Sequence, residues 1–444
     1  MARSRSISTG EHRSLKEPIE VILSGAYHLP ETKTNFSCPI KRLCIAPDLS
    51  GQERDLIDAL GLPGRHALIC DPNTHDALGQ RLAQKLPNAD LVVIDKPKAD
   101  EAQIADLIDK TRHAETLIAV GAGTLNDLAK YVSHQRGRPY AVFPTAPSMN
   151  GYTTTTASIS RGGEKRSHPA APPVGVFFDL NVLANAPHRL IQAGVGDSLC
   201  RSIAQVDWLL SHRLNGTDYM ATPFSIQTEA EADLVKRFDQ LNERDLDAVA
   251  ALVRLLVLGG LGMLMAGSSQ PGSQGEHLIS HYIDMFCDPH PGTLHGEQVG
   301  LATWTMANLQ QDMLKRASPP VLGEAAISRG PSAARYGNLI AASKAKALSG
   351  RRLDRLNQQL ERLWPSLRTE LSGVSLSPDQ LKKAFDAAGV AMDTDALGID
   401  RNFYGDAVRN ARQLRDRFTM LDLAADTGHL APFVEWHLQS TGST

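Results

Sequence analysis

Four residues in three short motifs combine the side-chain types that hold a catalytic metal ion. Asp197 lies in AGVGDSLCR, His277 and His281 lie in EHLISHYID, and His295 lies in GTLHGEQVG. His277 and His281 are one helical turn apart and face the same way. Two imidazoles and one carboxylate suit a divalent transition metal and leave coordination positions for water or substrate. The set predicts a catalytic metal site, although a chance cluster among fifteen histidines would give the same pattern.

A second motif, VGAGTLNDLAK, has glycines between an expected strand and an expected helix. Gly121, Gly123 and Thr124 lie where the N–H groups of a helix N-terminus can bind a diphosphate. Asn126 replaces the third glycine of the dinucleotide fingerprint, so an ordinary strand-to-helix turn explains the motif equally well. Asp71, which closes another expected strand, can accept hydrogen bonds from an adenosine ribose or can cap the following helix. The ribose interpretation favours NAD, because a carboxylate repels the 2'-phosphate of NADP.

The elements that must position these motifs follow an alternating pattern in the first part of the chain. Short apolar runs alternate with amphipathic stretches, as in a parallel sheet whose strands are joined by helices. We expect strands over 42–46, 66–70, 91–95, 116–120, 140–144 and 174–180, and helices over 53–59, 74–84 and 100–110. The polar segment 143–158 is expected to form a loop at the carboxyl end of the sheet, where open α/β folds bind ligands.

Beyond residue 186 the pattern changes to long helical periodicity. We therefore predict an α/β dinucleotide-binding domain with a Rossmann-like parallel sheet over 21–185 and a helical, metal-binding and catalytic domain over 186–444. A polar, partly disordered tail is expected over 1–20. The most membrane-like segment, 248–267, contains Arg254 and four glycines, which favours a buried helix over a membrane span. The charged stretch 351–364 is expected to form a solvated amphipathic helix.

Composition excludes several classes of protein. The 444 residues include 46 Lys plus Arg and 49 Asp plus Glu, and the net charge of -3 is not that of a nucleic-acid binder. The five cysteines are scattered without a CxxC pair, so we expect reduced thiols rather than a zinc or redox motif. The polar first 20 residues lack the apolar run of a secretory signal. We expect a cytoplasmic protein without membrane insertion.

The motifs together carry a family resemblance. VGAGTLNDLAK, FPTAPSMNGYTT, AGVGD, EHLISH and LHGEQVG occur in the same order as in metal-dependent polyol dehydrogenases related to iron-containing alcohol dehydrogenase, glycerol dehydrogenase and dehydroquinate synthase. Within that superfamily the chain most resembles the sn-glycerol-1-phosphate dehydrogenase family, over about residues 43–306. The resemblance implies the two-domain architecture of dehydroquinate synthase, an active site in the cleft between the domains, and a homodimer.

The resemblance also implies roles for single residues. It identifies Asp197, His277 and His295 as the metal ligands. It identifies the dinucleotide loop and the start of its helix with Gly121, Gly123, Thr124 and Asp127, and the polar loop beside the nicotinamide with Thr145 and Ser148. Asp71 matches the acid that binds the ribose.

Three positions depart from the family pattern. Ala122 stands where a glycine is frequent, and Asn150 stands where an aspartate usually lies near the substrate hydroxyls. Asn150 can hydrogen-bond to the substrate but cannot act as a charged base. Arg201 stands where the iron enzymes carry a histidine one turn after the ligand aspartate. A three-residue site for zinc or nickel is therefore favoured over an iron site.

The leading hypothesis is reversible reduction of dihydroxyacetone phosphate to sn-glycerol 1-phosphate, with NAD(H) and possibly NADP(H) and one divalent metal that stabilises the developing negative charge. His281 is either a proton relay or a residue that orients the metal site. The substrate phosphate requires cationic or backbone partners, and Lys165, Arg166 and Arg201 are available.

Three alternatives remain open. The same fold also suits a dehydrogenase of glycerol or another unphosphorylated polyol. A cyclase like dehydroquinate synthase would use NAD transiently, but such enzymes have Glu where Asp197 stands, and their lysine-rich motifs are not evident. A binding or regulatory protein could retain the scaffold alone, although the complete set of metal ligands argues against it.

Overall fold

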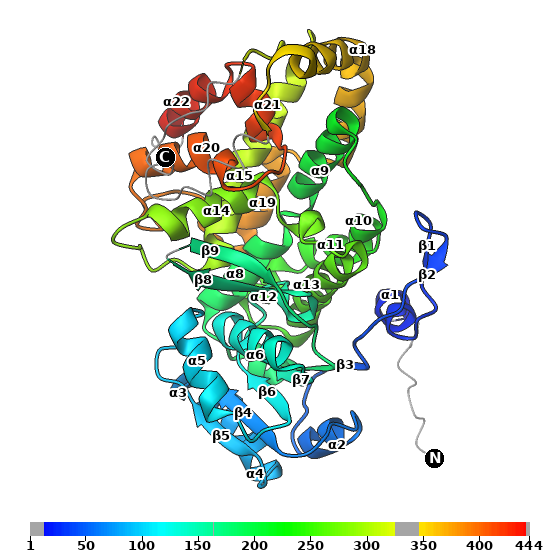
Figure 1. Ribbon diagram of the computed structural model, residues 1–444, viewed down its shortest axis with the longest axis vertical. Coiled ribbons are helices and arrows are strands. Elements are labelled where there is room, and N and C mark those ends of the chain that lie inside the picture. Colours follow the sequence, from blue (N-terminus) through cyan, green and yellow to red (C-terminus); the bar gives the residue numbers. More distant parts are fainter. Residues whose placement is uncertain (1–12, 163, 325–345, 441–444) are drawn as a thin grey trace, which may run out of the picture.

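The computed structural model describes residues 13–162, 164–324 and 346–440 (Figure 1). A parallel six-stranded sheet lies at the centre of the first half of the chain, in the order β3-β10-β7-β6-β4-β5. Its strands are β3 (Arg42–Ala46), β4 (His66–Cys70), β5 (Asp90–Val93), β6 (Thr116–Val120), β7 (Tyr140–Phe143) and β10 (Gly175–Asp179). All six lie where the apolar runs predicted strands, so the expected α/β class is confirmed.

Helices cover both faces of the sheet, because successive side chains of each strand point to opposite faces and both sets are apolar. In β6, Leu117 and Ala119 belong to one buried cluster, and Ile118 and Val120 belong to another. The first cluster includes side chains of α5 (Glu101–Lys110) and α6 (Gly123–Arg136). The second includes α2 (Glu53–Asp58) and a continuous helical stretch made of α3 (Pro72–Thr74), the π-helical turn η1 (His75–Gly79) and α4 (Gln80–Lys85).

The polar segment after β7 differs from the expectation. A short 3-10 turn, η2 (Gly151–Thr153), is followed by an antiparallel hairpin of β8 (Thr156–Arg161) and β9 (Glu164–Pro169). The loop expected over 143–158 was therefore wrong for its last residues. Ala157 and Ile159 are buried and alternate with polar neighbours, which is the pattern of a strand that covers a core on one face.

The start of the chain also requires a correction. The tail expected over residues 1–20 extends too far, because α1 (Arg13–Leu23) occupies its end and Ile19 and Ile22 are buried. Residues 1–12 lie outside the described residues. A hairpin of β1 (His28–Leu29) and β2 (Thr34–Asn35) follows, and both elements lie beside the helical half rather than against the sheet (Figure 1).

The second half of the described chain is helical, as predicted. Its main helices are α7 (Leu180–Ala184), α8 (His188–Ser198), α9 (Arg201–Asn215), α10 (Thr222–Ser225), α11 (Thr228–Val235), α12 (Phe238–Asn242), α13 (Leu246–Ala266), α14 (Gly275–Phe286), α15 (His295–Lys315), α18 (Gly350–Val374), α19 (Pro378–Ala388), α20 (Arg401–Asn410), α21 (Met420–Asp426) and α22 (Leu430–Ser440). Short 3-10 turns, η3 (Gln270–Gly272) and η4 (Ala411–Leu414), connect some of them.

Two of these helices test specific expectations. Among the described residues, α13 is the one helix long and apolar enough to cross a membrane, and 89% of its most apolar window is buried inside the protein. The buried helix predicted over 248–267 is therefore confirmed. The stretch 351–364 lies within α18, which packs against α9 and buries Leu356, Leu360 and Trp364 on one face. The amphipathic helix is confirmed, and its apolar face is covered.

A buried histidine near the chain end predicts acid sensitivity. His437 of α22 lies 3.1 Å from the hydroxyl of Thr305, and burial lowers the pKa of His437 to about 4. The unfolded chain takes up a proton near pH 6.5, whereas the folded chain resists protonation until about pH 4, so stability falls as pH falls between these values. In urea unfolding at pH 7 and pH 5, the wild type should lose about 1–2 kcal/mol more than His437→Gln. Equal losses in both proteins would contradict this assignment.

Candidate metal centre and nucleotide cavity

Close packing of α8 on α15 brings Asp197 to His295. A Cβ atom on Gly196 would lie 2.1 Å from the carbonyl oxygen of Gly296, and one on Gly296 would lie 1.9 Å from that of Ala193. Because such contacts are impossible for a side chain, glycine is required at both positions for the helices to approach this closely. The glycines in AGVGD and LHGEQVG therefore set the distance between two candidate ligands.

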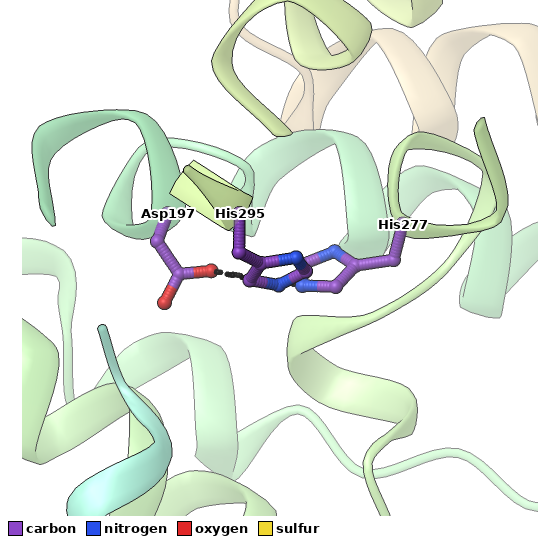
Figure 2. Close-up of side chains that lie close together, drawn as sticks. All are labelled: Asp197, His277 and His295. Atoms are coloured by element: carbon purple, nitrogen blue, oxygen red, sulfur yellow. Dashed lines mark ion pairs between the residues drawn. The ribbon is translucent and has the colours of Figure 1, made fainter. Parts of the chain in front are cut away.

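The three predicted ligands converge from three helices (Figure 2). Asp197 lies in the last turn of α8, His277 in the first turn of α14, and His295 at the first position of α15. Their ligand atoms all lie within 4.8 Å of one another. Oδ1 of Asp197 is 3.6 Å from Nε2 of His277 and 3.9 Å from Nε2 of His295.

Each ligand is oriented by a second polar group. Oδ2 of Asp197 accepts the backbone N–H of Asn150 at 2.7 Å, whereas its buried Oδ1 has no hydrogen-bond partner among the described residues. Nδ1 of His277 lies 2.9 Å from the buried Glu276 carboxylate. Because a carboxylate only accepts, Nδ1 donates, and Nε2 is left facing Asp197.

The tautomer of His295 follows from a chain of hydrogen bonds. The Ser280 hydroxyl donates its one proton to Oε1 of Gln298 at 2.7 Å, and the Gln298 amide group donates to Asp284. Ser280 therefore accepts from Nδ1 of His295, which lies 3.2 Å away. The lone pair of Nε2 then points to the same place as the free oxygen of Asp197.

The charges of the cluster favour a cation. Burial opposes the charged form of His277, but the carboxylates of Asp197 and Glu276 outweigh it and raise the pKa of His277 to about 9. Burial and the neighbouring His277 lower the pKa of His295 to about 4. Burial would raise the pKa of Asp197, but the two histidines outweigh it and lower that pKa. An orphaned buried oxygen and two directed imidazole nitrogens fit a divalent transition metal.

A cavity of about 1530 Å³ joins this cluster to the predicted nucleotide-binding residues. It is lined by residues from both ends of the expected site, namely Asp71, Gly123, Thr124, Asp127, Thr145, Ser148, Asn150, Asp197, His277, His281 and His295. Gly121 precedes these residues at the end of β6, and Gly123 begins α6 with a positive φ of 42°. The structure therefore brings the two predicted sites together in one cavity.

Two of the predicted nucleotide-binding acids also have structural partners. Oδ1 of Asp71 caps α3 by accepting the N–H of Thr74 at 2.8 Å, so the helix-cap alternative holds while the residue also lines the cavity. Asp127 accepts the N–H of Ser158 at 3.0 Å, which ties α6 to the β8–β9 hairpin. Burial raises the pKa of Asp127.

Lys130 was not found by sequence analysis. It is fully buried on α6, and its Nζ donates to the Gly151 carbonyl, the Thr154 hydroxyl and the Thr156 carbonyl. Burial lowers the pKa of Lys130 to about 8, against the opposing charge of Asp127. Lys130 therefore holds in place the segment that directly follows Asn150, a residue of the cavity lining. The sequence pattern around Lys130 is that of an ordinary helix and does not predict this role.

His281 lies beside the ligand cluster but does not join it. Its ring is stacked on His295 with centroids 6.1 Å apart, and its buried Nδ1 has no hydrogen-bond partner among the described residues. Burial, followed by the charge of Arg415, lowers the pKa of His281 well below the ordinary value. His281 is therefore a neutral imidazole at pH 7, with one nitrogen that donates and one that accepts.

Comparison with known proteins gives a consistent result. Residues 44–187 match the family model of iron-containing alcohol dehydrogenase. A glycerol-1-phosphate dehydrogenase, NAD(P)+, of Thermococcus kodakarensis is 32% identical over 63% of this chain and 82% of its own length. An enzyme of the same name from Halalkalibacterium halodurans is 29% identical over 80% of this chain and 84% of its own length.

Solved structures share the fold. A probable glycerol dehydrogenase of Sinorhizobium meliloti has a TM-score of 0.59 and 16% identity, over 91% of this chain and 98% of its own. A sulfoacetaldehyde reductase of Bifidobacterium kashiwanohense, solved with NAD+, has a TM-score of 0.59 and 15% identity, over 92% of this chain and 99% of its own. The expected two-domain fold class is confirmed by these neighbours.

Proposed function

The chain belongs to the glycerol-1-phosphate dehydrogenase family, and we propose that it interconverts dihydroxyacetone phosphate and sn-glycerol 1-phosphate with NAD(H) or NADP(H). One observation carries this proposal. The phosphate-binding type of strand-to-helix turn and the three-residue metal cluster line the same cavity, so a nicotinamide and a metal-held ketone can meet there. The reaction is a hydride transfer to a carbonyl carbon, coupled to uptake of one proton.

We propose that Asp197, His277 and His295 hold one divalent cation. When bound, such a cation polarises the substrate carbonyl and stabilises the negative charge that develops on its oxygen. Glu276 and Ser280 keep the two imidazoles in the tautomers that present Nε2. The mixed oxygen and nitrogen ligand set supports zinc or nickel.

Two further residues of the cavity lining, Asn150 and His281, would bind the substrate and deliver the proton that the alkoxide takes up. The amide side chain of Asn150 offers a donor and an acceptor for the substrate hydroxyl, and it carries no charge to act as a base. His281 is proposed as a relay, accepting a proton at one ring nitrogen and releasing another to the alkoxide. A neutral imidazole can accept a proton at one nitrogen and release one from the other, whereas it holds no extra proton with which to act as a general acid at the start of the reaction.

We further propose a division near residue 185, with the nucleotide held by the α/β part and the metal by the helical part. Gly121, Gly123 and Thr124 would cradle the diphosphate, with Thr145 and Ser148 beside the nicotinamide. The carboxylate of Asp71 supports NAD over NADP. A cytoplasmic homodimer is proposed from the family relationship alone.

The experiment compares substrates on protein loaded separately with zinc and with nickel. Oxidation of NADH and NADPH is followed with dihydroxyacetone phosphate and with dihydroxyacetone, and the chirality of the product is determined. We expect metal-dependent turnover of the phosphorylated ketone and formation of sn-glycerol 1-phosphate. Equal turnover of dihydroxyacetone would favour a polyol dehydrogenase. No turnover of either ketone, with metal and nucleotide bound, would contradict the proposal and favour a cyclase.

A further inference from the structure

Lys165 is the cation of the cavity that lies at its metal-binding end. Among the described residues, Lys98 and Lys165 are the lysines that line this cavity, and the lining contains no arginine. Lys98 follows β5, which pairs in parallel with β4, and Asp71 directly follows β4 at the same edge of the sheet. Lys165 is on β9, and the β8–β9 hairpin packs on α14, which carries His277 and His281. The two lysines therefore serve different ends of the cavity.

An ion pair fixes the position of the Lys165 ammonium. Its Nζ lies 2.6 Å from Oδ2 of Asp284, whose side chain is 10% exposed. Asp284 follows His277 and His281 on α14 at spacings of seven and three residues, which places all three on one helix face. The ammonium is therefore held over the same face as the metal-site histidines.

Electrostatic effects agree with this placement. Burial would raise the pKa of Asp284, but Lys165 and His290 together outweigh burial and hold that pKa well below its ordinary value. The Lys165 charge also opposes the rise that burial gives to the pKa of Asp127, which lines the same cavity.

The partners of Asp284 leave Lys165 able to bind an anion. Oδ1 of Asp284 accepts from Gln298 at 3.0 Å and lies 3.1 Å from Nε2 of His290, so its charge is shared among several donors. An ammonium has three N–H groups, and one is directed to Asp284. The other two can reach a phosphoryl group in the cavity.

The other cations considered for this role are placed differently. Arg201 makes two hydrogen bonds of 2.7 Å to the Glu231 carboxylate and does not line the cavity. Arg166 is exposed on β9 and also lies outside the lining. Of the three basic residues, only Lys165 has its side chain in the cavity.

We infer that Lys165, held by Asp284, binds the phosphate of the substrate and so selects a phosphorylated ketone over an unphosphorylated one. This inference rests on the proposed function. The Lys165 ammonium would donate to the phosphoryl oxygens while the ketone end lies at the metal cluster. Arg415, which follows η4 beside α14, adds positive charge behind His281.

The test is a comparison of Lys165→Ala, Lys165→Arg and Lys110→Ala on metal-loaded protein. Lys110 also pairs with an aspartate, at 2.9 Å from Asp106, but it lies on the surface of α5 outside the cavity. For Lys165→Ala we expect KM for dihydroxyacetone phosphate to rise about 10- to 100-fold, as for loss of a charged hydrogen bond. Its kcat/KM for dihydroxyacetone should fall much less than its kcat/KM for dihydroxyacetone phosphate, Lys165→Arg should recover part of the affinity, and Lys110→Ala should match the wild type.

Two outcomes separate this inference from the proposed function. If the wild type reduces dihydroxyacetone phosphate but Lys165→Ala has the same KM, the inference is wrong and the function stands. If the wild type does not reduce that ketone, calorimetric titration with inorganic phosphate still tests the site. Wild-type binding that weakens about tenfold or more in Lys165→Ala would support it, and equal or absent binding would overturn it.

Discussion

Asparagine in place of Asp197 is expected to remove bound metal and lower kcat/KM on the order of 1000-fold or more. The substitution keeps the size of the side chain, and its carbonyl oxygen can still accept the N–H of Asn150. It removes the negative charge on the buried Oδ1, which faces the two histidines. Metal content after dialysis, NADH oxidation and thermal unfolding measure the three effects separately.

Two further variants serve as comparisons, one with a smaller expected effect on metal binding and one with none. Glu276→Gln changes a residue that orients His277 without facing the cluster, and metal affinity should fall about 10- to 100-fold. Asp386→Asn alters an exposed pair with Lys382 on α19 and should match the wild type. An Asp197→Asn protein that keeps its metal and wild-type activity would show that the cluster is not the metal site.

Alanine in place of Gly196 is expected to damage both stability and the metal site. Its Cβ would lie 2.1 Å from the Gly296 carbonyl oxygen, which belongs to the backbone and cannot move without α15. Separation of α8 from α15 should lower the free energy of unfolding by about 2–3 kcal/mol. It should also weaken metal binding, because Asp197 and His295 lie on the separated helices.

Gly373 provides the matched control for this substitution. It lies in α18 with no atom within 4 Å of an added Cβ, so alanine should be neutral or stabilise by up to about 1 kcal/mol. Urea unfolding and metal content of both variants test the comparison. If Gly196→Ala unfolds like the wild type and retains metal, the close helix contact does not set the ligand spacing.

The four central strands of the sheet could be predicted from sequence because they are buried on both faces. TLIAV and YAVF read as continuous apolar runs, and each lies beside a turn signal. The β8–β9 hairpin was missed because Thr156, Ser158 and Ser160 surround its two buried apolar residues. The alternation is present, but the polar composition of the segment equally predicts a loop. Ile19 and Ile22 gave the same kind of weak signal within a polar segment.

The candidate site could be predicted only in part. Asp197, His277 and His295 were found because ligand types and ordered motifs mark them. Glu276, Ser280 and Gln298 lie inside or beside the same motifs, but their roles depend on hydrogen bonds between helices, which spacing does not reveal.

The ranking of basic residues also required tertiary structure. Lys165, Arg166 and Arg201 cannot be ranked from sequence, because solvation at the surface explains each cation equally well. Arg201 is separated from the others by its pairing with Glu231, and Lys165 by its pairing with Asp284 inside the cavity.

The most direct test of the account is a titration of metal-free protein with zinc or nickel. Bound metal per chain and NADH oxidation with dihydroxyacetone phosphate are measured on the same samples, beside Asp197→Asn. We predict that activity rises in proportion to bound metal, reaches its limit at one ion per chain, and stays at background in the variant. Full activity of the metal-free protein, or equal metal-dependent activity in Asp197→Asn, would contradict the account.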